Sequence, residues 1–182
     1  MTHCAKDPLS IVQLAVRRPV IVPDEASAGN IEELLARIAQ IPSSAWRAGD
    51  GSEHSWDEYH LSGAELDRLR HNLPLVAHLV DLATDMVGWI NRFGEGSWIA
   101  SHRDAGGDVQ CILPLELPAP DHGGAIWIGS PDLTIPMKVG DLLLFNAASL
   151  PHGTSPVVGD GRRRITINLR FWIGAPLDGP QS

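Results

Sequence analysis

The sequence predicts a mainly β fold in which helices cover one outer face of a sheet. The second half of the chain consists of short runs rich in Val, Ile and Leu, each bounded by glycine-containing turns. Helical periodicity is concentrated in the first half, so the helices precede the strands and do not alternate with them. Short strands at this spacing are typical of a β-sandwich, a jelly roll or a small barrel.

The first half of the chain begins with a predicted strand. Residues 10–22 hold short Val- and Ile-rich runs, which are typical of strands. Asn30 then fits the N-cap of a helix whose apolar residues recur at helical spacing. Residues 42–60 are polar and glycine-rich but contain three aromatic residues, so we expect a long loop that orders over a ligand. The predicted helices cover residues 31–41, 63–72 and 75–88, and Pro74 separates the last two.

The second half supplies the strands of the predicted sheet. A chain of 182 residues suits a single domain, 1–182. Within it, residues 1–88 would carry the first strand, the helices and the substrate loop, and residues 89–173 would form the β core. The predicted core strands are 89–93, 97–102, 109–117, 124–129, 133–139, 141–146 and 164–173.

The composition argues against several classes of protein. Lys plus Arg is 14 and Asp plus Glu is 22, which gives a net charge of −8. Proteins that bind nucleic acids or anionic membranes rely on basic surfaces, so neither partner is expected. No apolar run approaches the ~20 residues of a membrane span. Two cysteines, Cys4 and Cys111, are too few for a disulfide framework, and we expect reduced thiols in a cytoplasmic protein.

The segment His102-Arg103-Asp104 carries the clearest chemical signal. In a strand, residues i and i+2 point to the same face, so the imidazole and the carboxylate would project side by side. His152 follows the predicted strand 141–146 and is the natural third ligand. Two histidines and one carboxylate form a facial triad that leaves open positions on a non-haem Fe(II). On its own, however, the His102–Asp104 pair is equally compatible with a surface histidine beside a turn-capping aspartate.

An arginine-rich strand follows the third candidate ligand. Residues 162, 164, 166, 168 and 170 would share one face of this strand, which places Arg162, Arg164 and Arg170 together. Buried arginines without partners are energetically costly. This face is therefore either solvated or lines a pocket that binds an anion, and a guanidinium is well suited to a carboxylate.

Residues 89–173 resemble the 2-oxoglutarate- and Fe(II)-dependent dioxygenases. The segment NRFGEGSWIASHRD is similar to the approach to the metal motif in AlkB-type nucleic-acid dealkylases, and RITINLR is similar to a later strand of that branch. The segment HGTSPVVGDGRR resembles the prolyl-hydroxylase pattern around the distal histidine. Between them, DHGGAIWIG and VGDLLLFN resemble two further strands of the family. These motifs occur in the family's order.

The resemblance implies a double-stranded β-helix, or jelly roll, with helices packed on one sheet. It implies that Fe(II) is held by His102, Asp104 and His152, and that 2-oxoglutarate chelates the iron. By the prolyl-hydroxylase pattern, the far carboxylate of 2-oxoglutarate would bind Arg162, with Thr166 as a hydroxyl partner. By the dealkylase pattern it would bind Arg164, assisted by Arg170 and Asn91. Arg164 is preferred because its run matches as a block.

The activity implied by the resemblance is hydroxylation of an unactivated C–H bond with O₂, while 2-oxoglutarate is decarboxylated to succinate. The carboxylate of Asp104 favours hydroxylation over halogenation, and desaturation or cyclisation stays open. Phe93 stands where the dealkylase-like pattern has tyrosine, so one hydroxyl contact to the co-substrate is missing.

The expected substrate is a small metabolite such as an amino acid or a biosynthetic intermediate. The alternatives are a protein-residue (prolyl-type) hydroxylase and a non-enzymatic, cupin-like metal- or ligand-binding module. A nucleic-acid dealkylase is disfavoured because the region before the strands is acidic. The candidate substrate contacts are the aromatic residues Trp46, Trp56, Tyr59 and Trp98.

Overall fold

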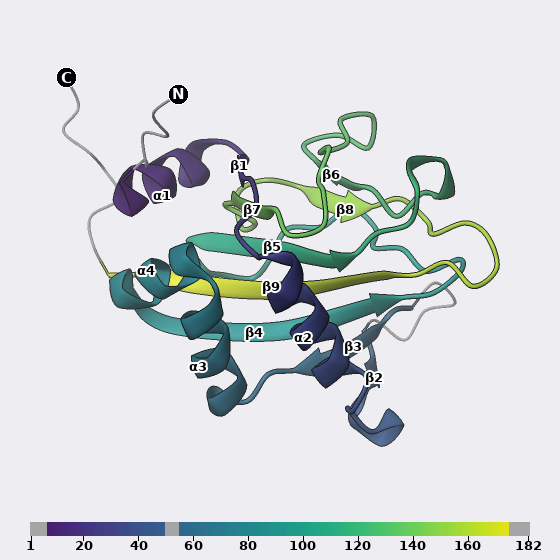
Figure 1. Ribbon diagram of the computed structural model, residues 1–182. Helices are drawn as coiled ribbons and strands as arrows, with labels where there is room; N and C mark the ends of the chain where they lie inside the picture. The colour runs from purple at the N-terminus through teal and green to yellow at the C-terminus, as the bar shows by residue number, and fades with distance from the viewer. Residues whose placement is uncertain (1–6, 50–54, 175–182) are drawn as a thin grey trace, which may run out of the picture.

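A seven-stranded antiparallel sheet lies at the centre of the fold, with helices on one face and a smaller sheet on the other (Figure 1). The computed structural model describes residues 7–49 and 55–174. Two short strands, β6 (Ile126–Ile128) and β8 (His152–Thr154), pair to form the smaller sheet. The larger sheet has the order β1 (Val20–Val22), β7 (Leu142–Phe145), β5 (Val109–Glu116), β9 (Arg164–Ile173), β4 (Ala83–Phe93), β3 (Asp57–His60) and β2 (Arg47–Ala48).

The helices pack against one face of the larger sheet (Figure 1). Their apolar residues form one continuous core with the inward residues of β5 and β9. The sequence-based expectation of helices on one side of a mainly β fold is therefore confirmed. Among the described residues, none of the helices has the length and apolarity that a membrane crossing requires. The helices are α1 (Pro8–Arg17), α2 (Ala28–Ile38), α3 (Gly63–Asn72) and α4 (Pro74–Leu82).

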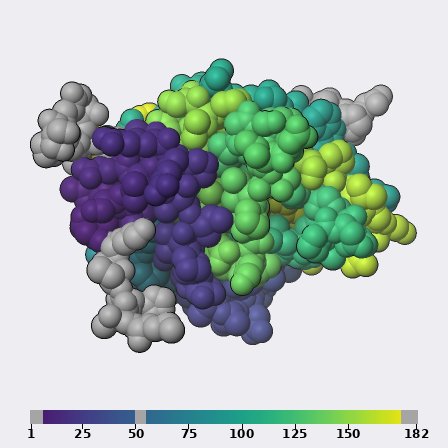
Figure 2. Space-filling view, turned by 90° about the horizontal axis from the view of Figure 1, so that it is seen from above, coloured from purple at the N-terminus to yellow at the C-terminus, as the bar shows by residue number. Residues whose placement is uncertain are grey.

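The start of the chain differs from the prediction of a strand over residues 10–22. Residues 8–17 form α1, and only Val20–Val22 form a strand. Asp7 caps α1 by accepting a hydrogen bond from the Ser10 backbone N–H, and proline occupies the first helical position. Strand β1 pairs with β7, so Val20–Val22 lie beside a segment that is distant in the sequence. Figure 2 shows the purple N-terminal part of the chain against green residues of its second half. The helix start signal of Asp7 and Pro8 therefore has a larger effect here than the strand preference of the β-branched residues.

The helix predicted over 75–88 is also shorter than expected. It ends at Leu82, and β4 begins at Ala83 and pairs with β9 along its length. The boundary expected between the two parts of the chain, at residue 88, therefore falls inside a strand. A Cβ atom at Gly88 would lie 2.6 Å from Leu66 Cδ2 and 2.8 Å from Leu169 Cδ2, so a larger residue would displace these two side chains.

The long loop expected over 42–60 contains structure of its own. Strands β2 and β3 pair with each other, and β3 extends the sheet by pairing with β4. Because the β3 sequence is polar, apolar alternation could not reveal it. Residues 50–54 of this segment lie outside the described residues.

Three smaller expectations were also wrong. Residues 97–102 and 133–139 form no strand and contribute only isolated bridges, one at His102 and one at Thr134. The N-cap of α2 is Ser27, whose hydroxyl accepts from the Asn30 backbone N–H. Asn30 lies inside this helix, and its side chain donates to the Asn72 carbonyl at 2.9 Å.

Candidate metal centre and its cavity

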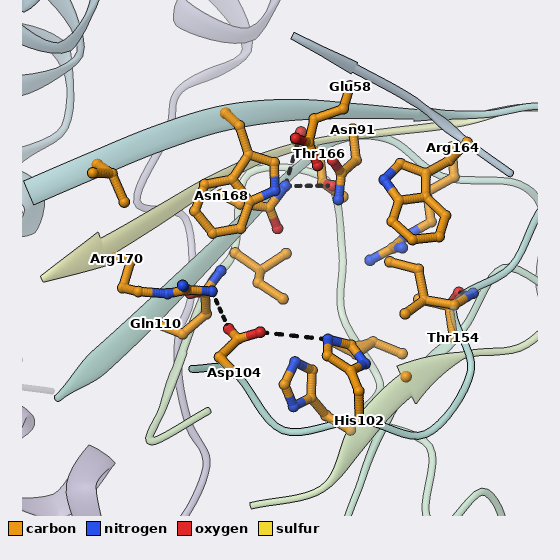
Figure 3. A pocket seen from close by; sticks show the side chains of 18 of the residues that line it. Glu58, Asn91, His102, Asp104, Gln110, Thr154, Arg164, Thr166, Asn168 and Arg170 are labelled. Carbon is orange, nitrogen blue, oxygen red and sulfur yellow. Dashed lines mark hydrogen bonds and ion pairs between the residues drawn. The ribbon is translucent and has the colours of Figure 1, made fainter. Parts of the chain in front are cut away.

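A cavity of about 390 Å³ lies on the face of the larger sheet opposite the helices (Figure 3). Strand β9 supplies much of its wall, because its residues alternate between two environments. Ile165, Ile167 and Leu169 belong to the core beneath the helices. The intervening residues Arg164, Thr166, Asn168 and Arg170 line the cavity. The expectation of a shared face is confirmed for these four residues and is wrong for Arg162, which precedes the strand and does not line the cavity.

The candidate metal ligands converge on this cavity. The ligand atoms of His102, Asp104 and His152 all lie within 4.8 Å of one another. The backbones of the two histidines are bound to each other, with His102 N to His152 O at 3.1 Å and His152 N to His102 O at 3.0 Å. This bridge places the imidazole rings 4.2 Å apart, although the residues are far apart in the sequence.

Backbone carbonyls orient both imidazole rings. The Nδ1 atom of His102 contacts the Ala100 carbonyl at 2.9 Å, and that of His152 contacts the Leu150 carbonyl at 3.1 Å. A carbonyl oxygen only accepts hydrogen bonds, so each contact places the proton of a neutral ring on Nδ1. The lone pair of each ring is then on Nε2, which is the arrangement required of a metal ligand.

The electrostatics of the three residues favour an ionised carboxylate beside histidines of unequal basicity. Burial opposes ionisation of Asp104, but its contact with the His102 imidazole and the charge of Arg170 outweigh this effect and lower the pKa of the carboxyl. The contact with Asp104 raises the pKa of His102. Burial lowers the pKa of His152. A neutral His152 and an ionised Asp104 are both ready to bind a cation.

Arg170 anchors the carboxylate of Asp104. One guanidinium nitrogen donates to Asp104 Oδ2, and Nε donates to Gln110 Oε1 at 3.2 Å. The guanidinium also lies over the ring of Trp89, 5.1 Å from its centroid. Arg170 thus fixes the orientation of the Asp104 carboxylate, the candidate metal ligand.

Arg164 lies across the cavity from Arg170 and, unlike Arg170, forms no ion pair with a carboxylate of the described residues (Figure 3). It is buried, and burial lowers its pKa to about 10. Its guanidinium lies over the Phe93 ring at 4.9 Å, and its Nε has no hydrogen-bond partner among the described residues. A buried cation with an unused donor is costly unless an anion binds to it.

Polar side chains without charge continue from Arg164 along the cavity wall. The Asn168 amide donates to the Thr166 hydroxyl at 3.3 Å. Asn91 lies on the neighbouring strand opposite Thr166, and its buried Oδ1 has no hydrogen-bond partner among the described residues. This wall can therefore still form hydrogen bonds with a polar ligand.

Several of the candidate residues lie outside the cavity wall. Arg162 precedes β9 and is exposed. Trp46 and Tyr59 pack against the core on the helix side, with their rings 5.9 Å apart. Trp98 is half-buried and is not among the residues lining the cavity. Of the four aromatic candidates, the structure places Trp56 in the cavity wall.

The sequence analysis did not single out Gln110, Trp89 or Glu58 as cavity residues, although all three line it. The signal for Trp89 was available, because it precedes Asn91 by two positions on the same strand. Glu58 and Gln110 could be found only once β3 and β5 had been paired with their neighbours.

The donor set fits the metal and co-substrate implied by the sequence resemblance. Two imidazoles and one carboxylate facing an open cavity match the facial triad of non-haem Fe(II) sites. The unused donor of Arg164 in the same cavity fits a carboxylate.

Comparison with known proteins identifies the fold. No family model matches the chain, and no curated protein matches it. A prolyl hydroxylase from Trichoplax adhaerens, solved with a hypoxia inducible factor oxygen degradation domain peptide, has a TM-score of 0.73 at 17% identity. The match covers 91% of this chain and 90% of that chain.

Two bacterial structures are similar over comparable lengths. A prolyl-4-hydroxylase from Pseudomonas putida has a TM-score of 0.69 at 16% identity, covering 93% of this chain and 100% of that chain. HygX from Streptomyces hygroscopicus, solved with nickel, 2-oxoglutarate and hygromycin B, has a TM-score of 0.68 at 15% identity. That match covers 93% of this chain and 88% of that chain. The chain therefore has the jelly-roll fold of 2-oxoglutarate- and Fe(II)-dependent oxygenases, as the sequence predicts.

Proposed function

We propose that this protein is an Fe(II)- and 2-oxoglutarate-dependent oxygenase that hydroxylates a C–H bond of a small molecule. One observation carries the proposal. A cluster of two histidines and an aspartate shares a cavity with a buried arginine that has an unused donor. A site that only binds a metal has no need of the arginine, whereas binding of a dicarboxylate beside the metal requires it.

Different residues of the cavity would bind the metal and the co-substrate. His102, Asp104 and His152 would hold Fe(II). Arg164 would bind the far carboxylate of 2-oxoglutarate, with Thr166 and Asn91 offering polar contacts beside it. Bound iron and 2-oxoglutarate together supply the means to oxidise a C–H bond with O₂, and succinate and carbon dioxide are released.

Arg170 has a positioning role in this proposal. It lies six residues after Arg164 on one strand, which separates their Cα atoms by about 20 Å. The two arginines therefore serve different carboxylates, and Arg170 already binds Asp104. By holding this carboxylate, Arg170 keeps one Asp104 oxygen turned towards His102, where Oδ1 lies 3.5 Å from Nε2.

The fold matches leave a protein-residue hydroxylase as the second candidate. The Trichoplax adhaerens structure contains a peptide, and that enzyme is a prolyl hydroxylase. In this chain, the β2–β3 hairpin borders the cavity through Trp56 and Glu58 and is the element against which a peptide would lie. Comparing succinate formation with small metabolites and with proline-containing peptides separates the two candidates.

The proposal is tested by anaerobic absorption spectroscopy with Fe(II), before and after addition of 2-oxoglutarate. A visible charge-transfer band that requires both additions is expected. His152→Ala should lose the band, because its metal affinity should fall by about 100-fold or more. His71→Ala is the matched control, since His71 is exposed on α3. Retention of metal without any band would contradict the proposal and favour a cupin-like binding module.

A further inference from the structure

The cavity contains a carboxylate, Glu58, that the proposed metal and co-substrate chemistry leaves unused. Trp56, just before β3, and Glu58 and His60 on β3 line the cavity, while Tyr59 packs on the helix side. Pairing of Glu58 with Asn91 and of His60 with Trp89 fixes the register of this strand. Figure 3 shows Glu58 on the same wall of the cavity as Asn91 and Thr166.

Among the described residues, no Arg or Lys side chain forms an ion pair with Glu58, and its register partner on β2, Arg47, is exposed and does not line the cavity. Asp104 is bound by Arg170, and Arg164 is the proposed partner of the co-substrate. The recorded ion-pair partner of Glu58 is His60, with Oε1 to Nε2 at 2.7 Å, and this ring is charged only when protonated. Glu58 is the more enclosed of the two, at 24% side-chain exposure against 64% for His60. A partly buried carboxylate without an arginine or lysine partner is stabilised by a cationic ligand.

Aromatic residues beside Glu58 strengthen this preference. Trp56 lies two positions before it on the same face, and its ring stacks on Phe93 with centroids 6.0 Å apart. Gly49 makes room for this ring, because a Cβ there would lie 2.2 Å from Trp56 Cε2. Indole faces attract organic cations, and an aromatic wall beside a carboxylate is the usual chemistry of ammonium recognition.

We propose that Glu58 is a specificity-determining residue whose carboxylate binds a protonated amine of the substrate, with the apolar stem of the amine against Trp56. This inference rests on the proposed function, because the cavity that holds Glu58 also holds the proposed metal ligands. A free metabolite and a lysine side chain present the same chemistry of an ammonium on an apolar stem.

The test measures binding of three matched probes to protein loaded with Zn(II) and 2-oxoglutarate, using ligand-observed NMR titration. The probes are 2-phenylethylamine, 2-phenylethanol and 3-phenylpropanoate, which differ chiefly in the charge of the end group. The amine should bind about tenfold more tightly than the alcohol, which is the worth of a charge-assisted hydrogen bond, and the carboxylate should bind most weakly. Glu58→Gln should reduce the affinity for the amine to that for the alcohol.

The matched control is Asp57→Asn. Asp57 is the neighbouring residue on β3 and carries the same charge, but it faces away from the cavity and pairs with Arg92 at 2.7 Å. This variant should keep the preference for the amine. Equal binding of amine and alcohol, no binding of the amine, or a preference that survives Glu58→Gln would each overturn the inference.

Two further arms separate the remaining possibilities. The first arm uses a short peptide with a central lysine. If the peptide binds more tightly than the free amine and loses this advantage in Glu58→Gln, the ammonium that Glu58 binds belongs to a lysine of a protein substrate. The Fe(II) and 2-oxoglutarate absorption band is measured on the same preparations. A band without amine preference overturns only the role of Glu58. Amine preference without a band overturns the oxygenase proposal and supports the ammonium site.

Discussion

The two faces of β9 perform different tasks within one strand. On the helix side, Ile165, Ile167, Leu169 and Phe171 are at most 2% exposed and belong to a continuous apolar core. On the cavity side, Arg164, Thr166 and Asn168 are also buried, at most 4% exposed, yet they are polar. Burial is thus nearly equal on the two faces, and the difference lies in what the buried groups contact.

The polar residues on the cavity face of β9 lower the stability of the folded protein and provide contacts for a ligand. Apolar side chains gain free energy when they leave water, whereas a buried guanidinium loses its hydration and recovers the cost only through a partner. The cost is tolerable because the helix face of the same strand is fully packed. We therefore expect substitutions on the helix face to lower stability without changing ligand affinity. Substitutions on the cavity face should lower ligand affinity and should leave stability unchanged or raise it.

The largest expected effect is on the helix face. Phe171→Ala should lower the free energy of unfolding by about 3–5 kcal/mol, because Phe171 is completely buried and the change leaves a cavity. Urea denaturation measures this loss, with Phe171→Leu as the milder control. The affinity for 2-oxoglutarate should remain unchanged at temperatures where the variant is folded. A change in affinity without loss of stability would break the proposed division between the faces.

Arg164→Leu tests the cavity face and should have effects of opposite sign. The affinity for 2-oxoglutarate should fall by about 100-fold, because a charge-assisted, bidentate contact is lost. The ligand-free protein should become more stable, by about 1 kcal/mol, because a buried cation without a counter-ion is removed.

Calorimetric titration and urea denaturation measure the two effects of this change. The control is Arg162→Leu, which alters an exposed arginine two positions earlier and should leave both quantities unchanged. If Arg162→Leu weakened 2-oxoglutarate binding and Arg164→Leu did not, the alternative co-substrate anchor would be correct.

The smallest effect concerns a carboxylate on the helix side. Glu25 accepts the Leu75 backbone N–H at 2.6 Å at the start of α4, and burial raises the pKa of this carboxyl. The folded state then holds the proton more tightly than the unfolded state, so stability should decrease as pH rises above about 4.5 through the raised folded pKa. Glu25→Gln should lack this part of the pH dependence. Identical profiles of unfolding free energy against pH would contradict the assignment.

Much of the fold was predictable because the strands of the core carry strong local signals. The run over 164–173 alternates apolar with polar residues, the run over 141–146 is mostly apolar, and both form strands close to the predicted bounds. The errors occur where local signals compete. Residues 10–17 include β-branched residues but follow an Asp-Pro helix start. Residues 83–88 continue a helical pattern, although pairing with β9 makes them a strand.

The residue types of the site and their order along the chain are visible in the amino-acid sequence. The alternation from Arg164 to Arg170 is a local property, because the period of a strand is the same wherever the strand lies. His102 and Asp104 lie in no strand, and the isolated bridge between His102 and His152 brings the candidate ligands together. Which of these residues share a cavity depends on the tertiary structure. The exposure of Arg162, the burial of Arg164 and the turning of Glu58 towards the site depend on pairing between distant strands. Alternation of residue types predicts that a strand has two different faces. Which face is covered by helices depends on how the strand packs in the folded protein.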